Sequence, residues 1–353
     1  MEIVFLGTSC AIPTRTRNLS SFIILYNGTQ ILIDAGEDIQ RQFEKASLKL
    51  NSPLIILISH MHGDHVIGLP GLLFHFNLID RTSKVKIIGP PGIFSYLMAH
   101  KYLIGLKADY LSEIVEIDKS SRKLYYYDFQ KPLNQSPKEI YSSSECIKVH
   151  QEKDFKIYAI PVDHSIPTWA FRFQEEKRPG KFNPVRANEL SIPKIYWSKI
   201  QELEENKTIE INGREIDPVK EGIIGPKRPG ISISYSADTR PCDNLGKIIR
   251  NSDILICEST YSSLFNNLAI EKKHMTAKES ALMAKDFNIK YLFLTHFSNR
   301  FEDEDELKKL YDEAKYEFEN IYIAYDLMRV KIKRNQNEIE IENLPKIKNY
   351  KNE

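Results

Sequence analysis

Short apolar runs rich in β-branched residues recur along the chain between polar turns, which is the pattern of buried strands. Longer segments with one apolar face lie between many of these runs and predict helices. The predicted strands are Glu2–Leu6, Phe22–Tyr26, Gln30–Ile33, Pro53–Ile58, Val85–Ile88, Ile114–Ile117, Leu124–Phe129, Ile147–His150, Phe155–Val162, Ala170–Phe173, Ile231–Ser236, Ile254–Cys257, Tyr291–Thr295 and Ile321–Tyr325. The predicted helices are Glu37–Ala46, Asp64–Phe76, Ile93–Leu103, Thr276–Phe287 and Glu302–Phe318. This order predicts the α/β class.

Histidines and a carboxylate gather directly after the apolar run Pro53–Ile58, in the segment Ser-His-Met-His-Gly-Asp-His that ends at His65. If the extended backbone continues, His60 and His62 point to one side and can bind one ion. Asp64 and His65 lie on the following turn and can bind a second ion. Imidazole and carboxylate ligands without thiolate suit zinc, with manganese and iron as alternatives. A single histidine is more often structural than a ligand, but four candidate ligands at one strand end favour a metal site.

Other predicted strands also end on aspartate or histidine. The residues that follow them are Asp163-His164 after Ile157–Val162, Asp238 after Ile231–Ser236, and His296 after Tyr291–Leu294. All would lie at the same edge of the sheets as His60, where α/β folds place their ligand sites. A carboxylate such as Asp238 can bridge two cations about 3.5–4 Å apart. Each of these residues alone has a structural alternative, but together they favour a two-metal site.

The segment from Glu175 to Ile209 lacks a clear strand or core-helix signal. It carries several basic residues, interleaved with aromatic residues and interrupted by proline and glycine: Lys177, Arg178, Lys181, Arg186, Lys194 and Lys199. Such a segment predicts either a projecting arm or a solvated surface loop. Asn212-Gly213 predicts a small hairpin over Ile209–Ile216, just as Asn27-Gly28 predicts one between the second and third strands.

Composition narrows the class of protein. With 353 residues, the chain is long enough for one large domain or two. The net charge of +1 excludes a global basic field, so any nucleic acid would have to bind through a local patch. Four scattered cysteines indicate neither a disulfide framework nor a thiolate zinc site. Neither a signal peptide nor a membrane-spanning stretch is recognisable, so we expect a cytoplasmic protein without membrane contact.

The chain resembles the ribonuclease Z family of the metallo-β-lactamase superfamily, from Glu2 to about Val330. The motifs that carry the resemblance are Phe5-Leu-Gly-Thr-Ser9, Pro13-Thr-Arg-Thr-Arg-Asn18 (the family's P-x-K-x-R-N loop, with Arg15 replacing lysine), Ser59 to Gly71, Asp238-Thr-Arg-Pro241, Leu294-Thr-His-Phe-Ser298 and Ala324-Tyr-Asp326. Two motifs depart from the family pattern. H-E-A-T appears as Cys257-Glu-Ser-Thr260, and H-S-T appears as His274-Met-Thr276.

This resemblance implies an αββα sandwich over residues 1–335, with a tRNA-binding arm inserted at about 175–209 and a charged tail over 336–353. It implies an endoribonuclease that removes the 3′ trailer from precursor tRNA, leaving a 3′-hydroxyl on the tRNA and a 5′-phosphate on the trailer. It also implies two zinc ions and a homodimer. One ion would be held by His60, His62 and His164. The other would be held by Asp64, His65 and His296, with Asp238 bridging.

Within this family the remaining candidates receive catalytic or binding roles. Asp64 orients or deprotonates the attacking water, and His274, polarised by Glu258, is the candidate acid for the leaving group. Substrate contacts are expected from residues of the P-x-K-x-R-N loop, a C-terminal arginine and the arm: Arg15, Arg17, Asn18, Arg300, Lys177, Arg178 and Lys181. For the arginines, a generic surface role is the alternative.

Two other functions compete with this prediction. A small-molecule hydrolase of the same fold, such as a lactonase, thioesterase or phosphodiesterase, would lack the basic arm and the arginine-rich loop. A non-catalytic RNA-binding module stabilised by metal would show gaps in the ligand set, and the sequence shows none.

Overall fold

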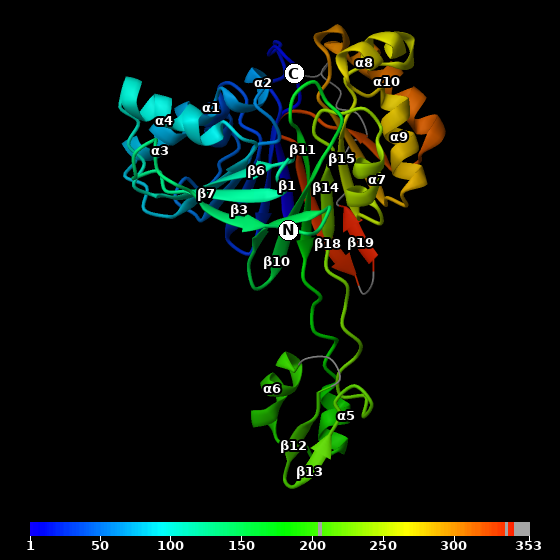
Figure 1. Ribbon diagram of the computed structural model, residues 1–353. Helices are drawn as coiled ribbons and strands as arrows, with labels where there is room; N and C mark the ends of the chain where they lie inside the picture. The colour runs from blue at the N-terminus through cyan, green and yellow to red at the C-terminus, as the bar shows by residue number, and fades with distance from the viewer. Residues whose placement is uncertain (204–206, 336–337, 342–353) are drawn as a thin grey trace.

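The computed structural model describes residues 1–203, 207–335 and 338–341. Two mixed sheets pack face to face, and helices cover the outer face of each sheet (Figure 1). The larger sheet has the strand order β19 (Glu338–Ile341), β18 (Arg329–Asn335), β1 (Glu2–Gly7), β2 (Ser21–Tyr26), β3 (Thr29–Ile33), β4 (Leu54–Leu57), β5 (Val85–Gly89), β6 (Leu111–Asp118), β7 (Lys123–Tyr127) and β8 (Lys138–Tyr141). The predicted αββα sandwich is therefore confirmed.

The smaller sheet lies against the larger one. Its order is β17 (Ile321–Ile323), β16 (Tyr291–Thr295), β15 (Ile254–Glu258), β14 (Ser232–Tyr235), β11 (Trp169–Glu175), β10 (Phe155–Pro161) and β9 (Ile147–Gln151). Aromatic rings from both sheets fill the layer between them, with the Phe5 and Phe293 centroids 5.8 Å apart and those of Phe22 and Tyr235 5.2 Å apart. This apolar layer holds the two sheets, and hence their loop-bearing edges, in a defined relation.

Helices bury the outer faces of the sheets. The larger sheet is covered by α1 (Ile39–Lys45), α3 (Leu69–Leu78) and α4 (Ile93–Ile104), and the smaller by α7 (Asp243–Ile249), α9 (Ala277–Asp286) and α10 (Glu304–Glu317). A shorter helix, α8 (Asn266–Lys272), leads into α9. Thr276 and Glu279 form a capping box that starts α9. No helix in the described residues is long and apolar enough to cross a membrane.

Strand β3 runs parallel to β4 in one sheet, and β14, β15 and β16 run parallel to one another in the other. Parallel neighbours end at a common edge, so the loops that follow them meet there. Those loops carry the predicted ligands except His164, which follows β10. The fold thus brings together side chains that are far apart in the sequence.

The insertion after β11 projects from the sandwich (Figure 1). Two extended segments leave and re-enter the body side by side, joined by the isolated bridges Arg178–Arg228 and Phe182–Ile224. At Gly180 they approach so closely that a Cβ there would lie 1.7 Å from the carbonyl oxygen of Gly225. Only glycine fits at such an approach.

The tip of this arm has a core of its own. It consists of α5 (Pro184–Glu189), a 3₁₀ turn at Lys194–Tyr196, α6 (Trp197–Glu202) and the hairpin β12 (Ile209–Ile211) and β13 (Arg214–Ile216). Its buried residues are Ala187, Ile192, Ile200, Ile211, Ile216 and Ile223. The hairpin on Asn212-Gly213 is confirmed, but it belongs to the arm, which runs to about residue 230 and not to 209. The absence of a helix signal was misleading, because the helices are short and their apolar residues cover only this small core.

Three other sequence predictions need correction. The predicted helix Asp64–Phe76 is two helices, α2 (Gly63–Val66) and α3, because Pro70 in the first turn of α3 lacks the N–H that a continuous helix would donate to Val66. The charged end of the chain is partly ordered, since β18 and β19 pair in the larger sheet. The rest of the predicted charged tail, residues 342–353, lies outside the described part. Helices α7 and α8 and strand β8 were missed because their apolar patterns are too short to stand out.

Candidate metal centre

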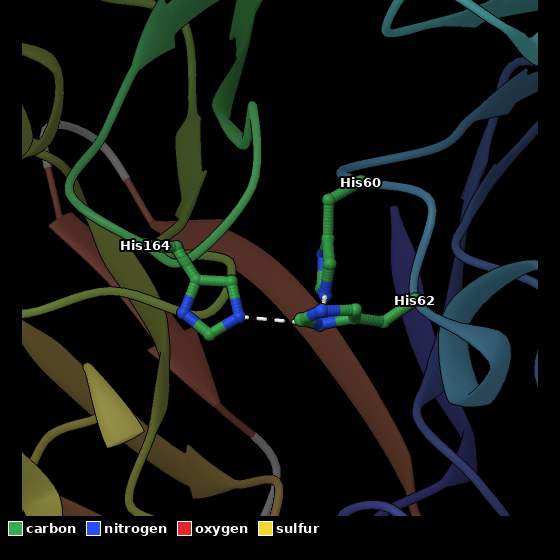
Figure 2. Close-up of side chains that lie close together, drawn as sticks. All are labelled: His60, His62 and His164. Carbon is green, nitrogen blue, oxygen red and sulfur yellow. Dashed lines mark hydrogen bonds between the residues drawn. The ribbon is translucent and has the colours of Figure 1, made fainter. Parts of the chain in front are cut away.

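Three imidazoles meet where β4 and β10 end (Figure 2). Nε2 of His60 lies 3.1 Å from Nδ1 of His62, and Nε2 of His164 lies 3.3 Å from the same Nδ1. One potential ligand nitrogen from each of the three rings lies within 4.8 Å of the other two. Although β4 ends at Leu57, before the histidines, His60 and His62 do point to one side. The structure therefore brings these three predicted ligands together.

A second group lies directly beside the first. Nε2 of His65 is 3.2 Å from Nε2 of His296, and Oδ2 of Asp64 is 3.5 Å from the former and 3.6 Å from the latter. Oδ2 of Asp238 lies 3.4 Å from Nε2 of both His65 and His296, and 3.6 Å from Nε2 of His60. One carboxylate oxygen thus faces both groups, the position that the sequence predicted for Asp238.

The rear nitrogens of the ligand rings are held by oxygen atoms. Nδ1 of His65 lies 2.8 Å from Oδ2 of Asp34, and Nδ1 of His164 lies 3.0 Å from the carbonyl oxygen of Lys273. Thr260 Oγ1 is 2.9 Å from Nδ1 of His296, and Ser59 Oγ is 2.9 Å from Nδ1 of His60. Such contacts orient the other ring nitrogen toward a metal.

The buried Glu258 and the partly exposed His274 form a pair at the side of the two groups. Nδ1 of His274 lies 3.0 and 3.2 Å from the two carboxylate oxygens of Glu258. The carboxylate also accepts hydrogen bonds from the backbone N–H of Thr239 at 2.7 Å, from that of Met275 at 3.1 Å, and from the Thr260 hydroxyl at 2.7 Å. This network fixes Glu258 and, through it, the ring of His274. Nδ1 of His274 lies 4.0 Å from Oδ2 of Asp238.

Burial and neighbouring charges shift the pKa values of these groups. Burial lowers the pKa of His60 well below its usual value, and the nearby His65 lowers it further. Burial opposes charge on His65 and His296, but Asp238 and other acidic neighbours outweigh it and raise the pKa of both. Burial likewise opposes charge on His274, but Glu258 outweighs it and raises the pKa of that ring.

These residues fit a divalent metal cofactor. Oδ1 of Asp238 is buried and has no hydrogen-bond partner within the described part of the chain. An orphaned buried carboxylate oxygen is costly unless a ligand satisfies it. Imidazole nitrogens and carboxylate oxygens that converge on a common centre, with four of the rings fixed from behind, are a donor set for divalent cations.

Sequence reasoning missed several residues that position this site. Asp34 accepts hydrogen bonds from the Ser59 backbone and hydroxyl and from Tyr235, besides its contact with His65. Asp34 ends a strand, as the ligands do, so that signal could have found it. Arg240 donates to the carbonyl oxygen of His274 at 2.5 Å and to Glu279 at 2.9 Å, linking the Asp238 loop to the start of α9. Arg240 belongs to the motif Asp238-Thr-Arg-Pro241, but that motif does not indicate a contact with the His274 segment.

The predicted substrate contacts of the P-x-K-x-R-N loop differ in accessibility. Arg15 is exposed beside a cavity of about 700 Å³. Arg17 is 2% exposed, and its guanidinium donates to the carbonyl oxygen of Phe301 at 2.9 Å. Its position argues against the predicted contact with substrate and indicates a role in holding the loop. Asn18 donates its side-chain N–H to the carbonyl oxygen of Glu37 at 2.7 Å. Arg300 is exposed, and its Nη1 lies 3.2 Å from Ser298 Oγ.

The predicted substrate contacts on the arm lie in its stalk, the two extended segments joined by the bridges Arg178–Arg228 and Phe182–Ile224. Lys177 and Lys181 are exposed and have no ion-pair partner among the described residues. Arg178 donates through Nε to the buried carboxylate of Glu175 at 2.6 Å, and its Nη2 also contacts that carboxylate. Arg178 therefore anchors the base of the arm, whereas the two lysines remain accessible to an anion.

Comparison with known proteins completes the description of the site. A protein-family model described as Anti-Pycsar protein Apyc1 matches residues 1–160. The solved structure of human tRNase Z, short form, superposes with a TM-score of 0.61 at 21% identity, covering 94% of this chain and 99% of that one. YhfI from Bacillus subtilis, a metallo-β-lactamase fold protein, gives a TM-score of 0.58 at 16% identity, covering 93% and 97% of the two chains. These similarities support the metallo-β-lactamase fold.

Curated relatives define the family. Ribonuclease Z of Clostridium perfringens is 35% identical over 327 residues, which cover 92% of this chain and 96% of the relative. Ribonuclease Z of Nitrosopumilus maritimus is 33% identical over 336 residues, which cover 94% of this chain and all of the relative. With this identity over nearly the whole length, and with the family's motifs gathered at one edge of the fold, the chain belongs to the ribonuclease Z family.

Proposed function

We propose that this protein is a metal-dependent endoribonuclease that cuts the 3′ trailer from precursor tRNA, leaving a 3′-hydroxyl on the tRNA and a 5′-phosphate on the trailer. The observation that carries the proposal is the position of Asp238 between the two ligand groups, with its Oδ2 within 3.6 Å of His60 from the first group and of His65 and His296 from the second. The full-length similarity to proteins named Ribonuclease Z supports the substrate assignment.

Two zinc ions fit the donor set best. His60, His62 and His164 would hold one ion, and Asp64, His65 and His296 the other, with Asp238 serving both. When bound, the cations supply Lewis acidity that neutralises charge on the scissile phosphate and makes an attacking water more acidic. Imidazole-rich sites suit zinc, whereas manganese prefers oxygen-rich ligands.

Asp64 is the residue that would orient the attacking water and take its proton. Its Oδ2 already accepts a hydrogen bond from the backbone N–H of Ala11 at 2.8 Å. That bond fixes the carboxylate plane at the partly exposed mouth of the site. The neighbouring imidazoles of His65 and His296 hold the pKa of Asp64 well below its usual value despite its burial, so it is an anion at neutral pH.

His274 would give a proton to the leaving 3′ oxygen. Its Nδ1 is held by Glu258, so a proton delivered to substrate must come from Nε2 on the opposite side of the ring. Glu258 favours the charged ring, which keeps a proton available near neutral pH. His274 is partly exposed, in contrast to the fully buried Glu258, so a substrate can reach the ring and not the carboxylate.

The arm is the element that would grip the folded tRNA. Lysines on its stalk and aromatic rings on its tip offer a surface for phosphate and stacking contacts, with Lys194 5.8 Å from the Trp197 ring and Lys199 5.8 Å from the Tyr196 ring. Such a surface recognises shape and backbone, not base sequence. A homodimer, in which one subunit's arm serves the partner's site, and a cytoplasmic location stay predictions of the sequence.

A small-molecule hydrolase is the alternative for the same metal edge. The arm argues against it, because a projecting subdomain with its own core has no role in binding a small ester. A lactonase or thioesterase would also leave the exposed Arg15 and Lys181 without a ligand.

The test is hydrolysis of a 3′-extended precursor tRNA by the pure, metal-loaded protein, with the product ends mapped by sequencing. We expect one cut at the 3′ side of the tRNA body, a 5′-phosphate on the released trailer, and no cut after chelation. The Asp238→Ala variant and a mature tRNA are the controls. Scattered cuts, or hydrolysis of lactones and thioesters with none of precursor tRNA, would refute the proposal.

A further inference from the structure

A cysteine lies at the second group of ligands, although the sequence analysis assigned it no role. Cys10 follows β1, and its Sγ lies within 4.8 Å of ligand atoms of both Asp64 and His296. Among the free cysteines of the described chain, Cys146, Cys242 and Cys257 belong to none of the potential ligand groups.

The backbone around Cys10 is held from both sides. The N–H of Cys10 donates to the carbonyl oxygen of Phe297 at 2.9 Å, directly after His296, and the N–H of Ser9 donates to Asn18 at 2.9 Å. The next residue, Ala11, has a φ of 62° and donates its N–H to Asp64 at 2.8 Å. A left-handed conformation at alanine is uncommon and persists only where surrounding contacts hold it. The position of the thiol is therefore built into the site.

A second observation independently points to a cation at this place. Asp238 is 2% exposed, its Oδ2 lies 3.4 Å from the His296 imidazole, and its Oδ1 has no hydrogen-bond partner in the described part of the chain. The orphaned oxygen calls for a positive ligand at Asp238, the carboxylate whose other oxygen faces the His296 imidazole.

We propose that Cys10 is a further ligand of the cation held by Asp64, His65 and His296. The proposal rests on the metal centre of the proposed function and extends it. On binding, the thiol releases its proton to solvent and the sulfur donates an electron pair to the cation, with no change in oxidation state.

A sulfur ligand changes which metal the second site prefers. Thiolate is a soft donor that favours zinc and disfavours manganese, whereas carboxylate and imidazole alone discriminate less between them. The two cation sites of one chain thus differ, the first built from imidazoles with Asp238 and the second containing sulfur. Cys10 is partly exposed, so the metal-free thiol is accessible to reagents.

Cobalt(II) titration of the metal-free full chain tests the proposal, because sulfur bound to cobalt absorbs in the near ultraviolet. We expect this absorption to appear with one of two cobalt equivalents in the parent protein, to vanish in Cys10→Ser, and to persist in the matched control Cys146→Ser. Cys146 is half-buried beside the edge strand β9. Alkylation by iodoacetamide, read by mass spectrometry, should modify Cys10 in the metal-free protein and be blocked by zinc.

Competition between metals gives a second measurement. Cys10→Ser should weaken zinc binding at one of the two sites at least about 10-fold, the smallest effect expected when a ligand shell is disturbed, and should change manganese binding less. If the parent binds two cobalt ions without the absorption, or Cys10 alkylates equally with and without zinc, the proposal is wrong although the metal centre stands. If the parent binds no cobalt, both are wrong.

Discussion

The stalk of the arm offers the sharpest test of tRNA recognition. Lys177, Lys181 and Lys227 lie on its two adjacent segments, and none has an ion-pair partner among the described residues. We expect that replacing all three with glutamine weakens binding of precursor tRNA by removing phosphate contacts. A matched triple variant removes the same charge from three cations of the tip that are already paired: Arg186 with Glu189 at 3.0 Å, Arg214 with Glu221 at 2.8 Å, and Lys220 with Asp217 at 3.1 Å.

The number of contacts sets the size of the effect. Each lost phosphate contact lowers the slope of log K against log salt by about 0.7–0.9, so three contacts lower it by about 2–3. At a salt concentration of about 0.15 M, this corresponds to a loss of about 10²-fold in affinity, or about 3 kcal/mol. The paired cations of the control should change the slope by less than one unit.

Filter binding of a labelled precursor tRNA over a series of salt concentrations measures both slopes. Hydrolysis of bis(p-nitrophenyl) phosphate should be the same in the parent and both variants, since the metal edge is elsewhere. Equal slopes in the stalk variant and the parent would refute the role of the stalk. Equal losses in the two triple variants would show that net charge, and not these three positions, governs binding.

The remaining predictions concern the site and its surroundings. His274→Ala should slow cleavage of precursor tRNA by about 10²–10⁴-fold with metal content intact. The loss should be smaller with bis(p-nitrophenyl) phosphate, because its leaving group needs no proton. His75→Ala is the control, and equal losses on both substrates would indicate a structural role for His274. Asp238→Ala should lower zinc content, measured by elemental analysis, more than His164→Ala, because its carboxylate faces both groups; equal zinc contents would contradict bridging. Burial raises the pKa of Asp326 to about 7, so the native state holds a proton that the unfolded state has lost and stability falls as pH rises toward 7. From pH 5.5 to 8, the urea-derived stability of the parent should fall by about 2 kcal/mol relative to Asp326→Asn, and parallel profiles would contradict the shift.

The local sequence was sufficient to predict the elements with strong patterns. Continuous apolar runs such as Ile254–Cys257 form buried strands, because every residue in them is apolar and suits burial on both faces of a sheet. Asn27-Gly28 specifies its hairpin because both residues adopt positive φ, 46° and 86°. The ligand set was also predictable, because each candidate directly follows a strand and parallel strands end at one edge.

Other features depend on contacts between distant segments. Gly68 lies against Gly36, where a Cβ would be 1.9 Å from the carbonyl oxygen of Gly36, and nothing in the apolar pattern around Gly68 records that contact. The arm became a packed subdomain because the returning chain brings Ile211 and Ile223 against its short helices. Arg17 resembled a surface cation by its neighbours in sequence, yet the fold buries it beside Phe297.

The sequence by itself determined which residue types stand at the strand ends, and so the metal chemistry and the family. Tertiary structure alone decided which of them share a centre. It also placed Asp34 and Thr260 behind the rings of His65 and His296, and Arg240 against the backbone of His274. It also brought the sulfur of Cys10 to Asp64 and His296. The reason is physical: propensity and periodicity act over a few residues, whereas a ligand sphere is made by atoms that meet only when the sheets pack.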